Sequence, residues 1–295
     1  MPWQSVLGPA ERLPAMTALD DWFAALLERT GNVGPLEMAL LGGRLAATPG
    51  LAFLAGYQGA LRALWPSAPA SLGALCVTEQ RSTRPADLAT RLEDLKLTGR
   101  KDFVTAAEAA DWLLVAAREE APGEPPRLAL CVLYSGAPGV RIEPLPALPL
   151  MPDIGHARLH LDNALCERLA GDGWDACVKP FRTLEDTHVL AAFCAWLYGV
   201  GLESAWPRDL LLRLGALLAG CAEVARQSAG APTSHVLLAG LFAQFESLRP
   251  VLDAAFASGA QSWAALWTRD RDLLSIASGP RARRLEKALA SLGMA

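Results

Sequence analysis

The sequence predicts an α+β fold in which a β-rich segment lies between two helical ones. Apolar residues recur at helical spacing over residues 1–72 and again after residue 177, whereas those of residues 73–166 alternate with polar ones between glycines and prolines. Apolar residues make up 52% of the chain, enough for a large core. We therefore expect an N-terminal helical domain (1–72), a small antiparallel β-barrel (73–166) and a C-terminal up-down bundle of four helices (177–295).

Three helices are expected in the N-terminal segment. Thr17 and Asp20 form a capping box ahead of the first, which ends at Gly31. Prolines open the second helix, over about 35–43, and the third, over about 49–66. Each helix has one apolar stripe, so the three must be covered by other elements.

The middle segment shows the two-residue period of strands. Apolar residues alternate over 128–134, in Val140 and Ile142, and in Leu159 and Leu161. Residues 119–127 are rich in proline and acidic side chains, which predicts an exposed loop between two strands.

Four helical segments follow. Thr183 and Asp186 form a second capping box, ahead of a helix that ends near Gly201. Pro207 opens a helix to about residue 227, and a third, capped by Thr233 or Ser234, follows. The fourth segment spans 262–290 and is interrupted by a Gly-Pro pair at 279–280. Arg281, Arg283, Arg284 and Lys287 are expected to form a solvated face of the last helix.

Two motifs of the middle segment carry a resemblance. Cys76–Glu79 places a Thr-Glu pair after a strand, and a Gly-Arg-Lys turn at residues 99–101 leads to Phe103, Val104 and Thr105. This order resembles the flavin-binding β-domain of the acyl-CoA dehydrogenase family, and the chain looks like a shortened, divergent member. The resemblance implies that the flavin would contact residues of both motifs and one further arginine: Cys76, Val77, Thr78, Phe103, Thr105 and Arg226.

The catalytic position of the family is altered. The resemblance places the catalytic base in an Arg-Asp…Ile-Tyr-Glu-Gly run, which here reads Arg269-Asp270 through to Ser278. A serine hydroxyl with no neighbouring base cannot remove the α-proton of a thioester at neutral pH. Some relatives place the base on the first bundle helix, where Glu185 and Asp186 lie. The other interpretation is that both complete the Thr183 cap and favour the helix dipole.

The parts that would hold the phosphates of the cofactor are reduced. The chain passes from Ala255 to Arg269 without a Gly-Gly-x-Gly loop, and Arg226 stands in a motif that has lost its phenylalanine. FAD binding is therefore expected to be weakened or lost. The sequence favours a degenerate acyl-CoA dehydrogenase-like protein. An active FAD-dependent acyl-CoA α,β-dehydrogenase with a relocated base, and a partner subunit of a full-length dehydrogenase, remain as alternatives.

Composition limits the partners. A net charge of −4 argues against nucleic acid. The longest apolar run, 189–202, is too short to cross a membrane, and the six cysteines have no C-x-x-C spacing, so we expect a cytoplasmic protein with reduced thiols. The resemblance adds an acyl-CoA thioester and a homo-oligomer, or a hetero-oligomer with another dehydrogenase.

A metal site is not expected. His156 and His160 invite a metal interpretation because they are four residues apart, but the surrounding pattern is that of a strand. Residues four apart in a strand lie ~13 Å from each other, too far to share one ion.

Overall fold

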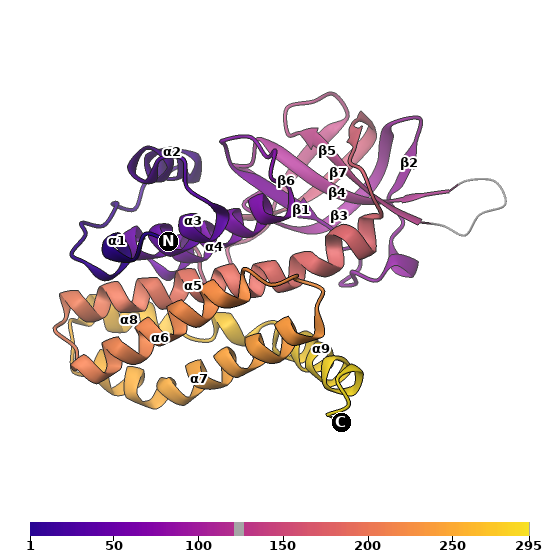
Figure 1. Cartoon of the computed structure of the whole chain (residues 1–295). Coiled ribbons are helices and arrows are strands. Elements are labelled where there is room, and N and C mark those ends of the chain that lie inside the picture. Colours follow the sequence, from indigo (N-terminus) through magenta and orange to yellow (C-terminus); the bar gives the residue numbers. More distant parts are fainter. Residues whose placement is uncertain (121–126, 295) are drawn as a thin grey trace.

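The structure of the protein is a computed structural model, and it describes residues 1–120 and 127–294. Most of the loop expected at 119–127 lies outside the described residues. Figure 1 shows the sheet at one end of the molecule and the helices at the other, with the long helix α5 running between the N-terminal helices and the later ones.

The three predicted N-terminal helices are present, and a short helix precedes them. The second and third predicted helices begin at their prolines, but the capping box of Thr17 and Asp20 is wrong. The first predicted helix has Ala18 at its N-cap and no capping side chain, so the pair does not close on the helix backbone. The elements are α1 (Trp3–Leu7), α2 (Leu19–Thr30), α3 (Pro35–Leu45) and α4 (Pro49–Leu64).

The middle segment is one eight-stranded sheet that curls into a half-barrel. The strands lie in the order β6-β7-β3-β2-β4-β5-β8, and β1 pairs with β4. β4 pairs in parallel with β1 and β2, and the other pairs are antiparallel, so the predicted all-antiparallel barrel is wrong in pairing and in closure. The strands are β1 (Gly73–Cys76), β2 (Arg91–Glu93), β3 (Lys96–Thr105), β4 (Trp112–Glu119), β5 (Arg127–Tyr134), β6 (Val140–Pro144), β7 (His156–Leu165) and β8 (Glu167–Arg168).

The predicted Gly-Arg-Lys turn is also wrong, because Gly99 lies inside β3. Its φ of +147° falls where the β3–β7 register shifts, and a Cβ there would lie 2.6 Å from the Thr90 Cα. A glycine is therefore required by close backbone approach within the strand. The tight turn before β3 is formed by Asp94 and Leu95, both at positive φ.

The helices after the sheet differ from expectation at two places. A turn of π-helix, Gly173–Val178, leads directly into α5, so Thr183 and Asp186 lie inside a helix and the second capping box is wrong. The last helical segment is interrupted at 271–277 and not at the Gly-Pro pair. Pro280 lies in the first turn of α9, where no amide donor is needed. The helices are α5 (Lys179–Glu203), α6 (Arg208–Val224), α7 (Pro232–Ala257), α8 (Gln261–Asp270) and α9 (Ser278–Ser291).

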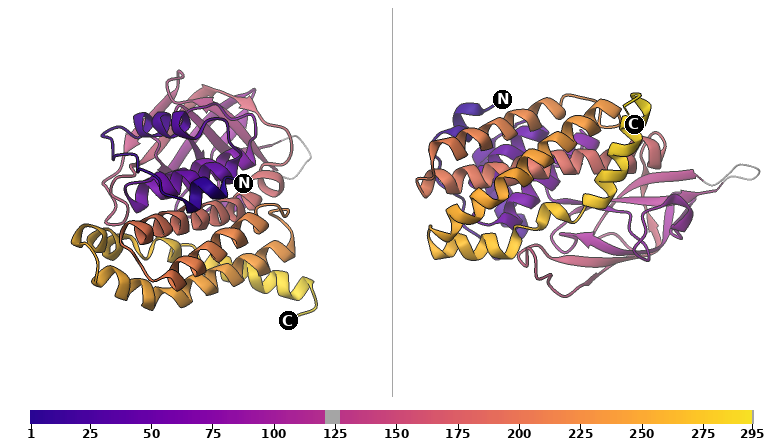
Figure 2. Two further views of the ribbon diagram at one scale, coloured as in Figure 1. Left: turned by 60° about the vertical axis from the view of Figure 1, so that its left-hand side comes forward. Right: turned by 90° about the horizontal axis from the view of Figure 1, so that it is seen from below.

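Packing places α5 at the centre of the molecule. One apolar cluster joins side chains of the N-terminal helices to those of α5–α8. This packing covers the apolar stripes of the N-terminal helices, for which the sequence predicted a covering element. A second cluster fills the inside of the half-barrel. A third packs the outer face of β4 and β5 against α4 and the start of α5. Figure 2 shows the resulting layers, with the N-terminal helices and the later ones on opposite sides of α5.

Within the described part of the chain, no helix combines the length and the apolar character needed to span a bilayer. Five of the six cysteines are buried as free thiols, and Cys166 is half-buried.

Candidate active site

A cavity of about 300 Å³ lies where the outer face of β3 and β7 meets the helices. Its walls are mainly apolar side chains from α4, α5, the segment after β6 and the break before α9. A few polar groups converge on it, which is the usual composition of a small-molecule site. The polar or charged lining residues are Thr105, His156, Glu185, Asp186 and Arg281.

The sheet wall of the cavity is formed by Phe103, Thr105 and His156. Thr105 and His156 are directly paired across β3 and β7, so their side chains leave the same face. The His156 ring stacks on Phe103, with centroids 4.4 Å apart and planes at 25°. Phe103 is 40% exposed and His156 only 3%. Burial lowers the pKa of His156, a shift that the Ile154 backbone partly opposes, and its Nδ1 makes no hydrogen bond within the described chain.

The helix wall carries the carboxyl group of Glu185. Burial, together with the neighbouring charge of Asp186, raises the pKa of Glu185 to about 8, although Arg284 and Arg182 oppose the shift. A carboxyl group with a raised pKa beside an apolar cavity is typical of a general acid or base. The alternative interpretation, that this residue completes a helix cap, is wrong because it lies inside α5.

Asp186 is occupied by ion pairs. Its two carboxylate oxygens accept hydrogen bonds from Arg281, at 2.9 Å, and from Arg284. The expected solvated face of α9 is therefore wrong for these two arginines, whose side chains are only 16% and 17% exposed. The pairs fasten α9 to α5 and leave Asp186 unsuited to accept a proton from a substrate.

Ser278 lines a different space. It is the first residue of α9 and borders a cleft of about 350 Å³ between α7 and α9, together with His235, Phe242 and Arg284. The residue before it, Ala277, lines the cavity beside the sheet. Ser278 and Glu185 thus border different pockets, which have Arg281 as a common lining residue.

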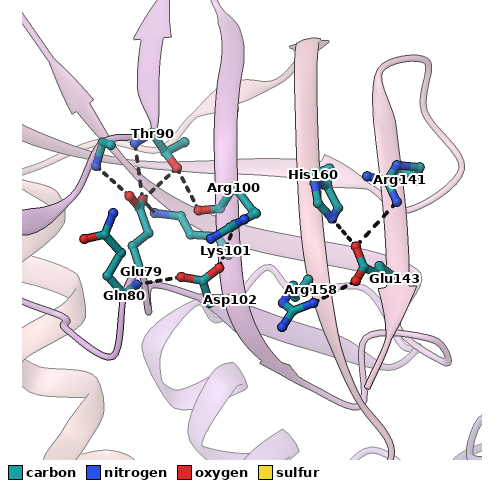
Figure 3. Close-up of polar contacts among 11 residues, drawn as sticks. Glu79, Gln80, Thr90, Arg100, Lys101, Asp102, Arg141, Glu143, Arg158 and His160 are labelled. Carbon is teal, nitrogen blue, oxygen red and sulfur yellow. Dashed lines mark hydrogen bonds and ion pairs between the residues drawn. The ribbon is translucent and has the colours of Figure 1, made fainter. Parts of the chain in front are cut away.

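A buried ion pair lies at the end of the first strand motif (Figure 3). The Lys101 Nζ donates to the Glu79 carboxylate at 2.6 Å, and the carboxylate also accepts from Ala89 N and from Thr90. Lys101 is fully buried, and burial lowers its pKa. Burial alone would raise the pKa of Glu79, but the lysine and the hydrogen bonds lower it. Each charge depends on the other, and the pair fixes the backbone that carries Thr78.

The remaining residues expected to contact a flavin are placed apart from the cavity. The Cys76 side chain points into the half-barrel, and Val77 packs between the sheet and α4. Thr78 is half-buried, and its carbonyl accepts from Asp102 N. Arg226 lies in the turn after α6, exposed and paired with Glu223 at 3.1 Å. In the described single chain, only Phe103 and Thr105 of this set line the cavity.

The two histidines of β7 have different surroundings. His156 is buried beside the cavity, whereas His160 pairs with Glu143 of β6 at 2.7 Å (Figure 3). The strand that separates them was predicted, and among the described residues no three metal-binding side chains gather at one point.

His156 and Arg281 are cavity residues to which the sequence assigned no function there. Alternation alone could have found His156, because it places residues 156, 158 and 160 on the face opposite Leu159 and Leu161. Arg281 could not be found in this way, since its position depends on where the chain breaks before α9.

Comparison with known proteins supports the fold. Neither protein-family models nor curated protein sequences match this chain. Among solved structures, butyryl-CoA dehydrogenase from Megasphaera elsdenii is similar with a TM-score of 0.66 at 14% identity, covering 92% of this chain and 89% of the other. Apo PigA gives 0.65 at 17% identity, covering 94% and 90%. The prolyl acyl carrier protein oxidase AnaB gives 0.56 at 16%, covering 92% and 85%.

PigA has also been solved with FAD and proline. The TM-scores establish a shared fold, whereas identities of 14–17% leave the chemistry to be argued from the residues of the site. The resemblance seen in the sequence is confirmed at the level of the fold: this chain has the α+β architecture of the acyl-CoA dehydrogenases, with a curled half-barrel between two helical parts.

Proposed function

We propose that this protein is a flavin-dependent dehydrogenase of acyl thioesters, which removes hydrogen from the α and β carbons of the acyl group. The observation that carries the proposal is the cavity between sheet and helices, where Glu185 faces the wall formed by Phe103, Thr105 and His156. The similarity to acyl-CoA dehydrogenases adds support at the level of fold.

The sheet wall fits the ring end of FAD. The partly exposed Phe103 offers an apolar surface and Thr105 a hydroxyl group. These residues would hold the ring, and bound FAD would supply the acceptor for a hydride. Contacts to the pyrophosphate are fewer, because no Gly-Gly-x-Gly loop stands between Ala255 and Arg269, so we propose that FAD binding is weak in the isolated chain.

Glu185 would act as the base. Its carboxylate takes the α-proton of the thioester, and a pKa of about 8 makes it a stronger proton acceptor than an ordinary glutamate once ionised. The apolar wall of Phe53, Val189 and Leu274 would accommodate an acyl group. This assignment replaces the base that the sequence resemblance would place at Ser278.

A second candidate is a degenerate protein without catalysis. It is favoured by Ser278, where the resemblance would place the family base, and by the lack of a Gly-Gly-x-Gly loop between Ala255 and Arg269. In that case the protein would be the partner subunit of a longer dehydrogenase, or it would assemble as a homo-oligomer.

We further propose that α5, α6, α7 and the interrupted α8–α9 segment form the four-helix bundle of the fold. The chain would then divide into a helical domain at 1–72, a β-domain at 73–166 and the bundle at 177–295.

Absorbance spectroscopy with FAD and thioesters tests the function. The purified protein is titrated with FAD and then mixed anaerobically with a panel of acyl-CoA and acyl-phosphopantetheine thioesters. Bleaching of the flavin absorbance near 450 nm, roughly the band of oxidised flavins, is the expected result. The Glu185→Gln protein, which keeps the shape of the side chain, should bind FAD but bleach far more slowly.

Two outcomes contradict the proposal in different ways. Failure to bind FAD at any concentration removes the dehydrogenase function altogether. FAD binding without bleaching by any thioester supports the degenerate candidate, and a second dehydrogenase chain that co-purifies and restores bleaching supports the partner subunit.

A further inference from the structure

His156 lines the cavity and has a buried polar atom without a hydrogen-bond partner among the described residues. It is 3% exposed, and its Nδ1 has no hydrogen-bond partner among the described residues. A buried polar atom without a partner costs about 1–3 kcal/mol, so such atoms call for an explanation. Here the atom belongs to a side chain that lines a cavity large enough to admit a ligand.

The neighbours of His156 indicate what kind of ligand would reach it. On one side its ring stacks against Phe103, and across the β3–β7 pair it lies opposite Thr105. Phe103 keeps 40% of its surface exposed. An aromatic surface, a hydroxyl group and a ring nitrogen on one face suit a flat conjugated molecule with hydrogen-bonding atoms at its edge.

Charge supports the same conclusion. Burial lowers the pKa of His156, so the imidazole is neutral at neutral pH and offers one donor and one acceptor. A metal ion is disfavoured, because the next histidine of the strand, His160, is committed to Glu143. The ligand that best matches His156 is therefore one whose ring is uncharged and carries both hydrogen-bond donors and acceptors at its edge.

We propose that His156 is a flavin-binding residue, and that its Nδ1 hydrogen-bonds the polar edge of the ring system that Phe103 and Thr105 border. This inference rests on the proposed function and adds to it a contact supplied by β7. It gives His156 a function beyond packing under Phe103.

Three substitutions separate the hydrogen bond from the packing. His156→Phe keeps a stacked ring and removes the nitrogen. His156→Asn places an amide group near the position of Nδ1, whereas His156→Gln places it near Nε2. His160→Ala is the matched control, since it lies on the same face of the same strand but outside the cavity.

The readout is the dissociation constant of FAD, measured by titration of apoprotein, together with the absorption maxima of the bound flavin. One hydrogen bond is worth about 1 kcal/mol, so His156→Phe and His156→Gln should weaken FAD binding by roughly five- to tenfold and shift the absorption maxima. His156→Asn should stay within about threefold of wild type, and His160→Ala should match it. Thermal unfolding without FAD identifies any variant that fails to fold.

Equal FAD affinity and unchanged spectra in His156→Phe, His156→Gln and wild type would overturn the inference and leave the proposed function standing. Equal losses in His156→Phe and His156→Asn would also overturn it, because packing rather than Nδ1 would then account for the effect. If the wild-type protein binds no FAD, the proposed function fails first and the inference falls with it.

Discussion

The two walls of the cavity differ in how they are built. The sheet wall rests on regular pairing, since Thr105 and His156 are held opposite each other by the β3–β7 ladder. The helix wall rests on a break in the chain at 271–277 and on ion pairs of Asp186 with arginines of α9. The sheet wall contains Phe103 and Thr105, which carry the sequence resemblance, whereas that resemblance would place a glutamate at Ser278.

The difference indicates in which wall a catalytic residue can be replaced by one on another element without loss of the fold. A side chain on a sheet face is fixed by the register, and changing its position requires the whole strand to shift. Around the helix wall several side chains face the same space from different elements. Under the proposed function, the carboxyl group is therefore supplied by Glu185 of α5 and not from the position of Ser278 on α9.

The largest expected effect comes from removing the carboxyl group of the helix wall. Glu185→Gln should lower the rate of flavin reduction by thioester about 10²–10⁴-fold, because positioned proton transfer is worth that much. Stopped-flow absorbance of FAD-loaded protein measures it. FAD affinity should stay near that of wild type, since Glu185 lies on the wall opposite the flavin-binding one. An unchanged rate would show that the base is elsewhere.

The next effect concerns the network behind the sheet wall. Lys101→Met leaves the Glu79 carboxylate buried without its cation, and breaking a buried pair in this way costs about 3–5 kcal/mol. The free energy of unfolding from urea titrations should fall by that amount. The double variant Glu79→Gln Lys101→Met should recover much of the loss, because no charge then remains unpaired. A single variant as stable as wild type would mean that water reaches the pair.

The sheet wall was largely predictable from the sequence, and the helix wall was not. Alternation around Leu159 and Leu161 indicated the strand that carries His156, and the Phe103–Thr105 motif indicated its neighbour. For the helix wall, Thr183 and Asp186 have the spacing of a capping box, which local sequence cannot distinguish from two residues inside a helix. The π-helical turn at Gly173–Val178 leads into α5, so the helix begins before Thr183 and needs no cap there. Glu185 therefore lies inside the helix, on the wall of the cavity, and not at a helix end.

A moderate effect is expected on how stability depends on pH. The folded protein holds the proton of Glu185 up to a pKa of about 8, above its ordinary value of 4.5, so the wild-type protein loses stability as pH rises from about 4.5 to 8. Glu185→Gln removes that loss. It should be more stable than wild type by roughly 2 kcal/mol at pH 9, a value reduced to allow for the partial exposure of the group, and similar to wild type near pH 4.

Unfolding titrations at the two pH values measure this difference, and Glu185→Gln then separates catalysis from folding. A variant that is inactive but more stable at high pH fits a group kept for chemistry at a cost in stability. A pH-independent difference between the two proteins would indicate that Glu185 titrates normally and is solvated.

The smallest effect is expected at Ser278, where the sequence resemblance would place the base of the dehydrogenases. Ser278→Glu places a carboxylate in the first turn of α9, facing the cleft that Arg284 lines rather than the cavity beside the sheet. The helix dipole should stabilise the protein by about 0.3–1 kcal/mol, and the rate of flavin reduction should not rise. The same substitution in the Glu185→Gln background should restore no activity. Recovery in that background would show that Ser278 can reach the substrate, that α9 shifts when ligand binds, and that the helix wall is built as in the dehydrogenases after all.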